Sequence, residues 1–196
     1  TLLVHVAERS KVREELARMY DNIADMDGQV GEILKQLADD GLAENTIVIY
    51  GSDHGDGVPR AKRSLYDSGL RVPLMIRWPK SLGSTATPGS TSNELVSLVD
   101  LAPTVLALAG VEIPTHLPGR VLVGAKAGTA PELVFAARDR MDTEYDMMRS
   151  ARDGRFLYIR NFSPELPYAG HITYRNQSAI MQEWFRLQAD GKLTGP

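Results

Sequence analysis

The sequence predicts an α/β protein that ends in a smaller antiparallel sheet with a packed helix. Residues 11–42 form a long amphipathic segment, and an apolar run rich in β-branched residues follows at 46–52. A helix laid against a strand is the repeating unit of α/β layer folds. From Pro131 the pattern changes to short alternating runs separated by Asp-Gly and similar turns, which is typical of antiparallel strands.

The composition is that of a globular protein. Of 196 residues, 43% are hydrophobic and 24% are charged. The formal net charge of −3 gives no electrostatic attraction to nucleic acid or anionic lipid, and no apolar run reaches membrane-spanning length. The chain has no cysteine, which excludes disulfides and thiolate chemistry within it. We therefore expect that the chain neither binds nucleic acid nor spans a membrane.

The first half of the chain contains one long helix and two strands. From Lys11 to Leu42, apolar residues recur at three- and four-residue steps and form a single stripe, and Gly41 provides a left-handed cap. The run Thr46–Ser52 predicts a buried strand, and VPLMI at residues 72–76 predicts a second. The stripe consists of Leu16, Met19, Tyr20, Ile23, Met26, Val30, Ile33, Leu34 and Leu37.

The second half contains two shorter helices and the antiparallel strands. The segment Val96–Ala109 predicts a helix with Asp100 as its N-cap and Pro103 in the first turn. A hairpin is expected to turn at Asp153-Gly154. The segment Ser178–Asp190 predicts the last helix, whose inward-facing residues are Ile180, Met181, Trp184, Phe185 and Leu187.

Between the two predicted strands lies a loop rich in charged residues. Asp53 and His54 directly follow the first strand, and Gly55 lets the backbone turn tightly there. On such a turn a carboxylate oxygen and an imidazole nitrogen can converge on one cation. Lys62 offers a compact positive charge that suits a tetrahedral oxyanion. A cation site beside such a lysine suits cleavage of a phosphate or sulfate ester, whereas the alternative is a capped turn with a solvated basic face.

The run GSDHGDGVPRAKRSLYDSGLRVPLMIRWP resembles the type I sulfatases of the alkaline-phosphatase superfamily. In that family an Asp followed by Asn or His ligates a divalent ion, usually calcium, and a Lys or Arg before a Leu-Tyr-acid segment contacts the sulfate. The resemblance implies that Asp53 and His54 are metal ligands for one Ca²⁺ ion and that Lys62 is catalytic. Arg60 and Arg63 are further candidates for substrate binding. Together with RNFSPELPY, the segment KRSLYDSG is most similar to a bacterial branch related to heparan N-sulfatases.

The resemblance implies the second half of a sulfatase. Residues 1–124 are expected to form part of an alkaline-phosphatase-like sheet-and-helix catalytic core, and residues 125–196 the start of a smaller antiparallel α+β subdomain. The family's formylglycine nucleophile arises from the Cys or Ser of a C/S-x-P-x-R motif, which this chain lacks. We expect formylglycine in sequence before Thr1, so the chain alone should be inactive. A core cut through its sheet would expose apolar strand edges, and we expect the chain to self-associate through them.

Two alternatives to a sulfuric ester hydrolase stay open. Phosphodiesterases and phosphonate monoester hydrolases of the same superfamily also place Asp-His-Gly after a core strand, although the KRSLYDSG segment favours sulfate. The other alternative is a non-catalytic fragment with a binding role. Resemblance alone also implies a sulfated small molecule or glycan as the partner, and a periplasmic or secreted location.

The segment Arg160–Gln177 is rich in aromatic and polar residues and is expected to be a loop. Aromatic faces stack on sugar rings, while His and Arg side chains reach hydroxyl or sulfate groups. His171 is the candidate substrate-binding residue of this loop, with Tyr168 and Arg175 behind it. The alternative is an ordered surface loop that closes over the catalytic domain.

Overall fold

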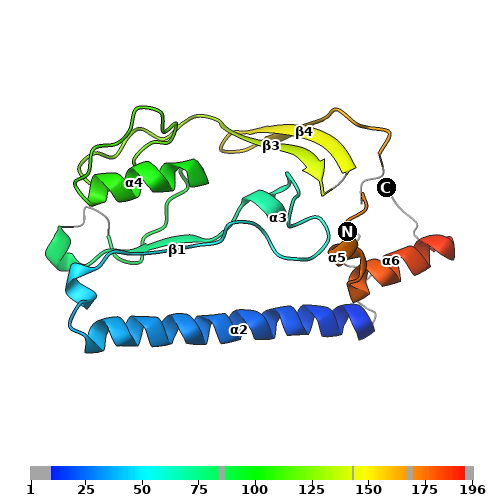
Figure 1. The fold of residues 1–196 in the computed structure, drawn as a ribbon, viewed down its shortest axis with the longest axis horizontal. Helices are drawn as coiled ribbons and strands as arrows, with labels where there is room; N and C mark the ends of the chain where they lie inside the picture. The colour runs from blue at the N-terminus through cyan, green and yellow to red at the C-terminus, as the bar shows by residue number, and fades with distance from the viewer. Residues whose placement is uncertain (1–9, 84–86, 143, 167–169, 193–196) are drawn as a thin grey trace.

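The computed structural model describes residues 10–83, 87–142, 144–166 and 170–192. In Figure 1 a long helix runs along one side of the molecule, a thin two-stranded sheet lies in the middle, and a short helix and a second sheet lie on the opposite side. The helices are α2 (Ser10–Asp39), α3 (Asp67–Leu70), α4 (Leu101–Leu108), α5 (Thr173–Asn176) and α6 (Ala179–Ala189), with 3₁₀ turns at Ala43–Asn45, Lys80–Leu82 and Leu98–Asp100.

The two sheets are both antiparallel. Strands β1 (Val48–Gly51) and β2 (Leu74–Arg77) pair from Val48 opposite Arg77 to Gly51 opposite Leu74. Both predicted strands are confirmed, but the prediction that the first is buried is wrong. Residues 48–50 are only half-buried, because the described residues provide a single neighbouring strand and little cover on either face.

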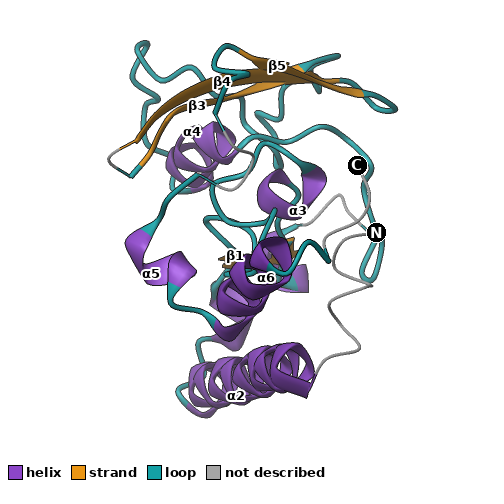
Figure 2. Ribbon diagram, turned by 90° about the vertical axis from the view of Figure 1, so that its right-hand side faces the viewer, coloured by secondary structure: helices purple, strands orange, loops and turns teal. Residues whose placement is uncertain are grey.

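The second sheet has the order β3 (Val134–Met141), β4 (Glu144–Arg152) and β5 (Leu157–Asn161), as Figure 2 shows. The predicted hairpin turn is confirmed: the Asp153 carboxylate accepts hydrogen bonds from the backbone N–H groups of Arg155 and Phe156. These two bonds lower the pKa of Asp153. The boundary between residues 1–124 and 125–196 stays a prediction.

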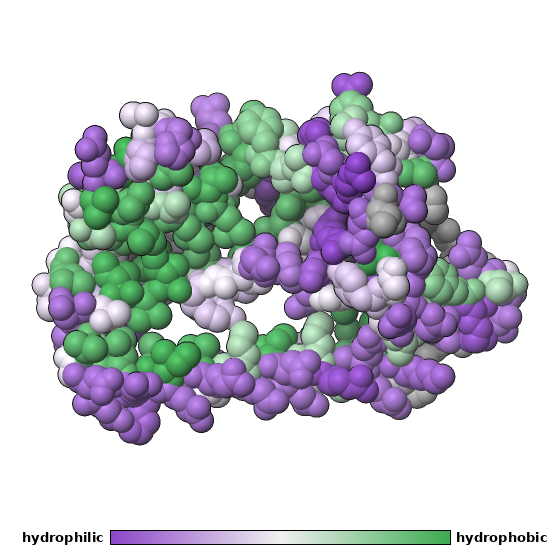
Figure 3. All heavy atoms as spheres, in the orientation of Figure 1, coloured by the Kyte–Doolittle hydropathy of each residue, from purple (hydrophilic) through white to green (hydrophobic). Residues whose placement is uncertain are grey.

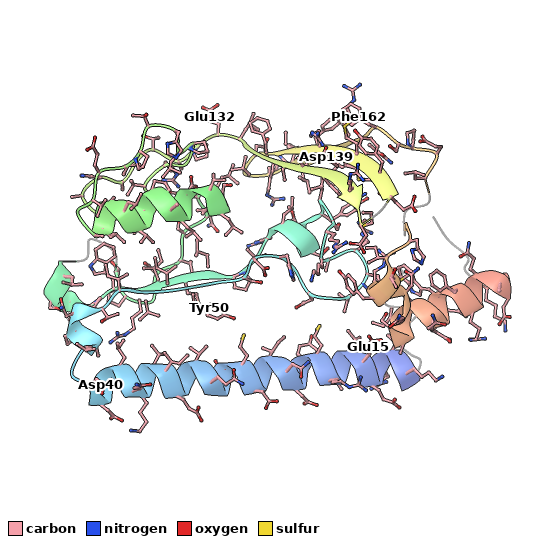
Figure 4. All side chains as sticks on the ribbon, in the orientation of Figure 1. Glu15, Asp40, Tyr50, Glu132, Asp139 and Phe162 are labelled. Carbon is pink, nitrogen blue, oxygen red and sulfur yellow. The ribbon has the colours of Figure 1, made fainter. Side chains whose placement is uncertain are left out.

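A small hydrophobic core joins the start of α2 to α6. It contains Val12, Ile180, Met181, Trp184 and Leu187. The carboxylate of Glu15 accepts a hydrogen bond of 2.8 Å from the N–H of Ile180, and the Ser178 hydroxyl accepts one from Met181, so both satisfy the first turn of α6. Figure 4 labels Glu15 at this junction. The predicted helix is confirmed, but Phe185 is exposed rather than inward-facing, since α2 contacts only one side of α6.

Helix α4 confirms the predicted helix, with one correction at its start. Asp100 occupies the N-cap position, but its carboxylate makes no capping bond to α4. Instead the buried carboxylate accepts bonds of 3.0 Å from the Ser97 N–H and 2.9 Å from the Arg120 N–H. It therefore closes the 3₁₀ turn at Leu98–Asp100 and links this turn to the backbone at Arg120.

The described chain is far more open than a compact domain. Over all 196 residues, 21.5 kDa in mass, the accessible surface is 13697 Å², whereas a folded monomer of this mass exposes roughly 9,200 Å². The apolar stripe of α2 is largely uncovered: Tyr20, Ile23, Met26 and Ile33 are exposed, and the Tyr50 hydroxyl donates to the Met26 sulfur at 3.2 Å. Figure 3 shows apolar residues on the inner side of α2 beside openings through the molecule, and polar residues on its outer side.

We predict that the 196-residue chain alone self-associates through this stripe. Burial of apolar surface favours association by about 25 cal/mol per Å². Replacing Ile23 and Ile33 by Lys should shift the chain toward monomer in light scattering coupled to size exclusion. Ala17 and Ala24 are exposed and lie outside the stripe, so replacing both by Lys is the matched control and should leave the association unchanged. A wild-type chain that is monomeric and melts sharply would contradict the prediction.

Candidate active site

A compact loop connects the end of β1 to α3. Its base is closed by backbone hydrogen bonds from Ser52 to Pro73 and from Gly55 to Gly69, both 3.2 Å. The approach at Gly55 is very close: a Cβ atom there would lie 1.9 Å from the carbonyl oxygen of Ser68. Gly69 has the same constraint, since its Cβ would lie 2.3 Å from the Ser64 carbonyl oxygen. Only glycine fits these two positions, so they hold the loop against the start of α3.

This loop brings Asp53 and His54 together. The His54 Nε2 atom lies 3.5 Å from a carboxylate oxygen of Asp53, with 84% of the Asp53 side chain and 40% of the His54 side chain exposed. The His54 Nδ1 atom lies 2.8 Å from the carbonyl oxygen of Gly55. A carbonyl only accepts, so Nδ1 carries the proton, and in the neutral ring the lone pair of Nε2 faces Asp53.

These two side chains fit part of a metal site. One hard oxygen and one unprotonated imidazole nitrogen point to the same space, and the Nδ1 bond fixes the ring as backbone carbonyls do for metal-binding histidines. Nowhere in the described ranges do three or more His, Cys, Asp or Glu side chains gather as a complete metal site would require. Asp53 and His54 can therefore supply two of the several ligands that a hard divalent cation such as Ca²⁺ takes.

Asp53 and His54 line an open pocket, here called the outer pocket, between the loop and β3. Its charged lining residues are Asp53, His54, Arg63, Arg138, Asp139 and Arg140. The last three were not predicted as site residues. Alternation along the strand would have placed Arg138 and Arg140 on one face, but no signal in the sequence indicated that this face meets the loop. The ladder with β4 is irregular between Arg138 and Arg140, and such irregularities re-aim side chains. Figure 4 labels Asp139 in this region.

A buried ion pair joins the loop to the second sheet. The Arg138 guanidinium donates to the Asp146 carboxylate at 2.6 Å and to the Arg63 carbonyl oxygen at 3.0 Å. The Arg138 and Asp146 side chains are only 10% and 5% exposed. Arg63 adds a second link through its ion pair with Asp142, and that hydrogen bond raises the pKa of the Arg63 guanidinium. The wall of the outer pocket is therefore fixed relative to Asp53 and His54.

The other predicted cations lie next to a second pocket, here called the inner pocket. Its polar lining residues are Arg60, Lys62, Ser64, Tyr66, Arg138, Arg175 and Trp184. Lys62 and Arg63 approach the face of Tyr174, with the Lys62 ammonium 5.6 Å from the ring centroid. The structure thus brings Arg63, but not Lys62 or Arg60, into the pocket that Asp53 and His54 line. Their roles in substrate contact stay predictions.

The C-terminal loop is placed only in part. His171 is exposed beside α5, and its role stays a prediction. Tyr168 lies outside the described residues. Arg175, on α5, lines the inner pocket and donates to the Gly170 carbonyl oxygen. Of the three residues, Arg175 is therefore the one that the structure connects to a pocket.

Comparison with known proteins agrees with this fold. The family model described as Sulfatase matches residues 5–111. The chain is 43% identical over 190 residues to an ulvan-active sulfatase of Formosa agariphila, covering 96% of this chain and 31% of the relative. It is 30% identical over 167 residues to the N-sulphoglucosamine sulphohydrolase of Homo sapiens, covering 80% of this chain and 33% of the relative.

A solved structure gives the same fold. It contains a protein in complex with its substrate D-glucosamine-2-N,6-O-disulfate and matches with a TM-score of 0.58 at 23% identity, covering 87% of this chain and 38% of that one. The chain therefore belongs to the sulfatase family, whose members are sulfuric ester hydrolases. The predicted family and fold class are confirmed. The chain spans about a third of the length of the two curated relatives.

We predict that Gly55→Ala displaces the loop, because the new methyl group would overlap the Ser68 carbonyl oxygen. Overpacking of this kind lowers the free energy of unfolding by roughly 1–3 kcal/mol. A methyl group at Gly57 would meet no atom within 4 Å, so Gly57→Ala should stay within about 0.5 kcal/mol of wild type. Urea unfolding of the three proteins measures both effects, and equal losses would refute a steric role for Gly55.

We also predict that Asp146→Asn destabilises the protein strongly, because it leaves the Arg138 charge buried without its carboxylate. Breaking a buried pair in this way costs about 3–5 kcal/mol. The pair of Asp139 with Arg149 is a matched control on the same sheet, with side chains 61% and 43% exposed, so Asp139→Asn should cost less than about 1 kcal/mol. Thermal or urea unfolding distinguishes the two; a small loss for Asp146→Asn would contradict the prediction.

Proposed function

We propose that the protein to which this chain belongs hydrolyses sulfate esters or sulfamates of carbohydrates. The observation that carries the proposal is the Asp53–His54 pair, with His54 oriented by the Gly55 carbonyl oxygen, in a chain of the sulfatase family. The family generally uses a metal ion and formylglycine. We propose that the ion is one Ca²⁺, because Asp53 offers a hard oxygen, and that formylglycine comes from sequence outside this chain.

The names of relatives support carbohydrate as the substrate class. One relative is named an ulvan-active sulfatase, another is named for N-sulphoglucosamine, and the solved structure holds a disulfated glucosamine as its substrate. We therefore propose a sulfated sugar as the partner. The same relatives give no support to a phosphodiester or phosphonate substrate. A threonine nucleophile in the complete protein would favour that alternative.

Each proposed role follows from the chemistry of the side chain. Asp53 and His54 hold the cation, which when bound polarises the sulfate oxygens. Lys62 neutralises negative charge that develops on the sulfate group during transfer. Arg60 and Arg63 are proposed to orient the substrate, and Arg63 is held for this by its bond to Asp142. His171 is proposed to contact the sugar from the C-terminal loop.

The proposed location is the periplasm or the extracellular space. Within the described ranges, no helix is both long and apolar enough to cross a membrane. The support for secretion is family membership alone. The test is fractionation of the source cells with an antibody raised against the chain.

We predict that substitutions of Asp53 and Lys62 both lower turnover but differ in their effect on bound metal. In the complete protein, Asp53→Ala should lose bound metal and activity together, because the cation loses its carboxylate ligand. Lys62→Ala should keep the metal and lose about 10²–10³-fold in kcat, the usual effect of removing one preorganised transition-state contact. Metal content by elemental analysis and hydrolysis of a chromogenic aryl sulfate measure the two quantities.

The matched control is Asp56→Ala, which removes a carboxylate from the same loop but outside the outer pocket. It should retain both metal and turnover. Normal metal content in Asp53→Ala would remove Asp53 from the metal site. Normal turnover in Lys62→Ala would exclude a catalytic role for Lys62.

A further inference from the structure

The inner pocket has an unusual charge balance. Four of the residues that line it, Arg60, Lys62, Arg138 and Arg175, are cations, and no residue of its lining is an Asp or Glu. The charge of Arg138 is met by Asp146, as described above. The part of the chain that the structure describes provides no ion pair for Arg175. Arg175 therefore has no direct ionic partner among the described residues, and the charge of Asp142 compensates it only from a distance.

Two buried donors in this pocket also lack hydrogen-bond partners. The Nε1 atom of Trp184 and the Nε atom of Arg175 are buried and make no hydrogen bond within the described ranges. Trp184 is only 9% exposed. Both atoms can donate but not accept, and a buried donor without an acceptor is costly. They come from neighbouring elements, α5 and α6, and both border the same pocket.

The electrostatics of Arg175 point the same way. Burial lowers the pKa of the Arg175 guanidinium, and the charges of Arg138 and Arg63 act in the same direction, whereas Tyr174 and Asp142 raise it without reversing the shift. Guanidinium stays protonated at physiological pH, so the repulsion is relieved by an anion rather than by loss of the proton. A bound oxyanion would supply both the missing acceptor atoms and the missing negative charge.

The size of the pocket limits that anion to a small group. Its volume is about 30 Å³, whereas one water molecule needs about 10–15 Å³ on the same measure. The pocket thus accommodates about two oxygen atoms, as in a carboxylate or one face of a sulfate. It adjoins the outer pocket, with which it shares Ser64, Leu65 and Arg138 as walls.

We infer that the inner pocket binds a second anionic group of the sugar substrate, with Arg175 Nε and Trp184 Nε1 as its donors, while Lys62, which borders the same pocket, contacts the sulfate that is hydrolysed. The inference rests on the proposed function for the identity of the ligand as a sugar. It makes the protein selective for saccharides that carry at least two acidic groups. Arg175 and Trp184 are thus specificity-determining residues rather than catalytic ones.

The test is calorimetric binding of three matched probes, glucuronate, glucose 6-sulfate and glucose, to the complete protein. Glucuronate and glucose 6-sulfate should bind, and glucose should not. Because glucose 6-sulfate can also bind at the proposed catalytic site, the probe whose affinity falls more in Arg175→Met identifies the group as carboxylate or sulfate. Arg175→Met should weaken the anionic probes at least about tenfold, since it removes a charged donor of similar length. Trp184→Phe, which keeps an aromatic ring and removes the indole N–H, should weaken them about threefold or more.

Two controls separate this site from the catalytic one. Arg160→Met removes a cation that lies over Phe162, outside the inner pocket, and should leave binding unchanged. Asp53→Ala should bind glucuronate as wild type does, because the donors of the inner pocket do not depend on the metal. If Asp53→Ala loses catalysis but still binds glucuronate, the loss bears on the proposed function and not on the inner pocket. Equal binding of glucose and glucuronate, or unchanged affinity in Arg175→Met and Trp184→Phe, would overturn the inference.

Discussion

The arrangement of the site depends on the contacts that the guanidinium of Arg138 makes. It reaches back 75 residues to the carbonyl oxygen of Arg63 and also binds the carboxylate of Asp146 on the neighbouring strand. A buried charge must be met by partners, and here the partners belong to two parts of the chain that are distant in sequence. The loop that carries Asp53 and His54 and the strand that faces it are therefore held in one position.

The backbone of the loop adopts unusual conformations to make this contact. Arg60 and Arg63 have φ angles of 69° and 67°, in the left-handed region that residues other than glycine rarely adopt. Each such residue costs about 1–2 kcal/mol. At Arg63 the cost is offset by the bonds of its carbonyl oxygen to Arg138 and of its side chain to Asp142. The close packing at Gly55 and Gly69 leaves the backbone few alternatives.

Local patterns in the sequence predicted most of the elements. The stripe of α2, the hairpin at Asp153 and the helix after Ser178 all follow from short-range periodicity and turn chemistry, and each is confirmed. The failures concern contacts between distant segments. Burial of the first strand and of Phe185 depends on what covers them, and the role of Asp100 depends on Arg120, 20 residues away.

In the candidate site, too, the residues that are close in sequence were predictable and those brought together from distant segments were not. Asp53 and His54 are adjacent in sequence, so their approach was predictable from a tight turn at Gly55. Arg138 and Arg140 enter the outer pocket only because β3 packs against the loop, and no local pattern reveals that packing. The lining of the inner pocket by Arg175 and Trp184 likewise depends on how α5 and α6 dock.

The packing of β3 against the loop also has a consequence for how such a protein can diverge. The proposed metal ligands Asp53 and His54 lie on one segment. The other pocket residues, Arg138, Asp139, Arg140, Arg175 and Trp184, lie on elements much later in the chain. Asp139 is exposed, and we expect its ion pair to contribute less than about 1 kcal/mol, so this position can vary at small cost to folding. Mutations there would change the lining of the outer pocket while the proposed metal ligands stay unchanged. Proteins that descend from one ancestral gene could in this way differ in what the pocket accepts while they keep the same proposed metal site.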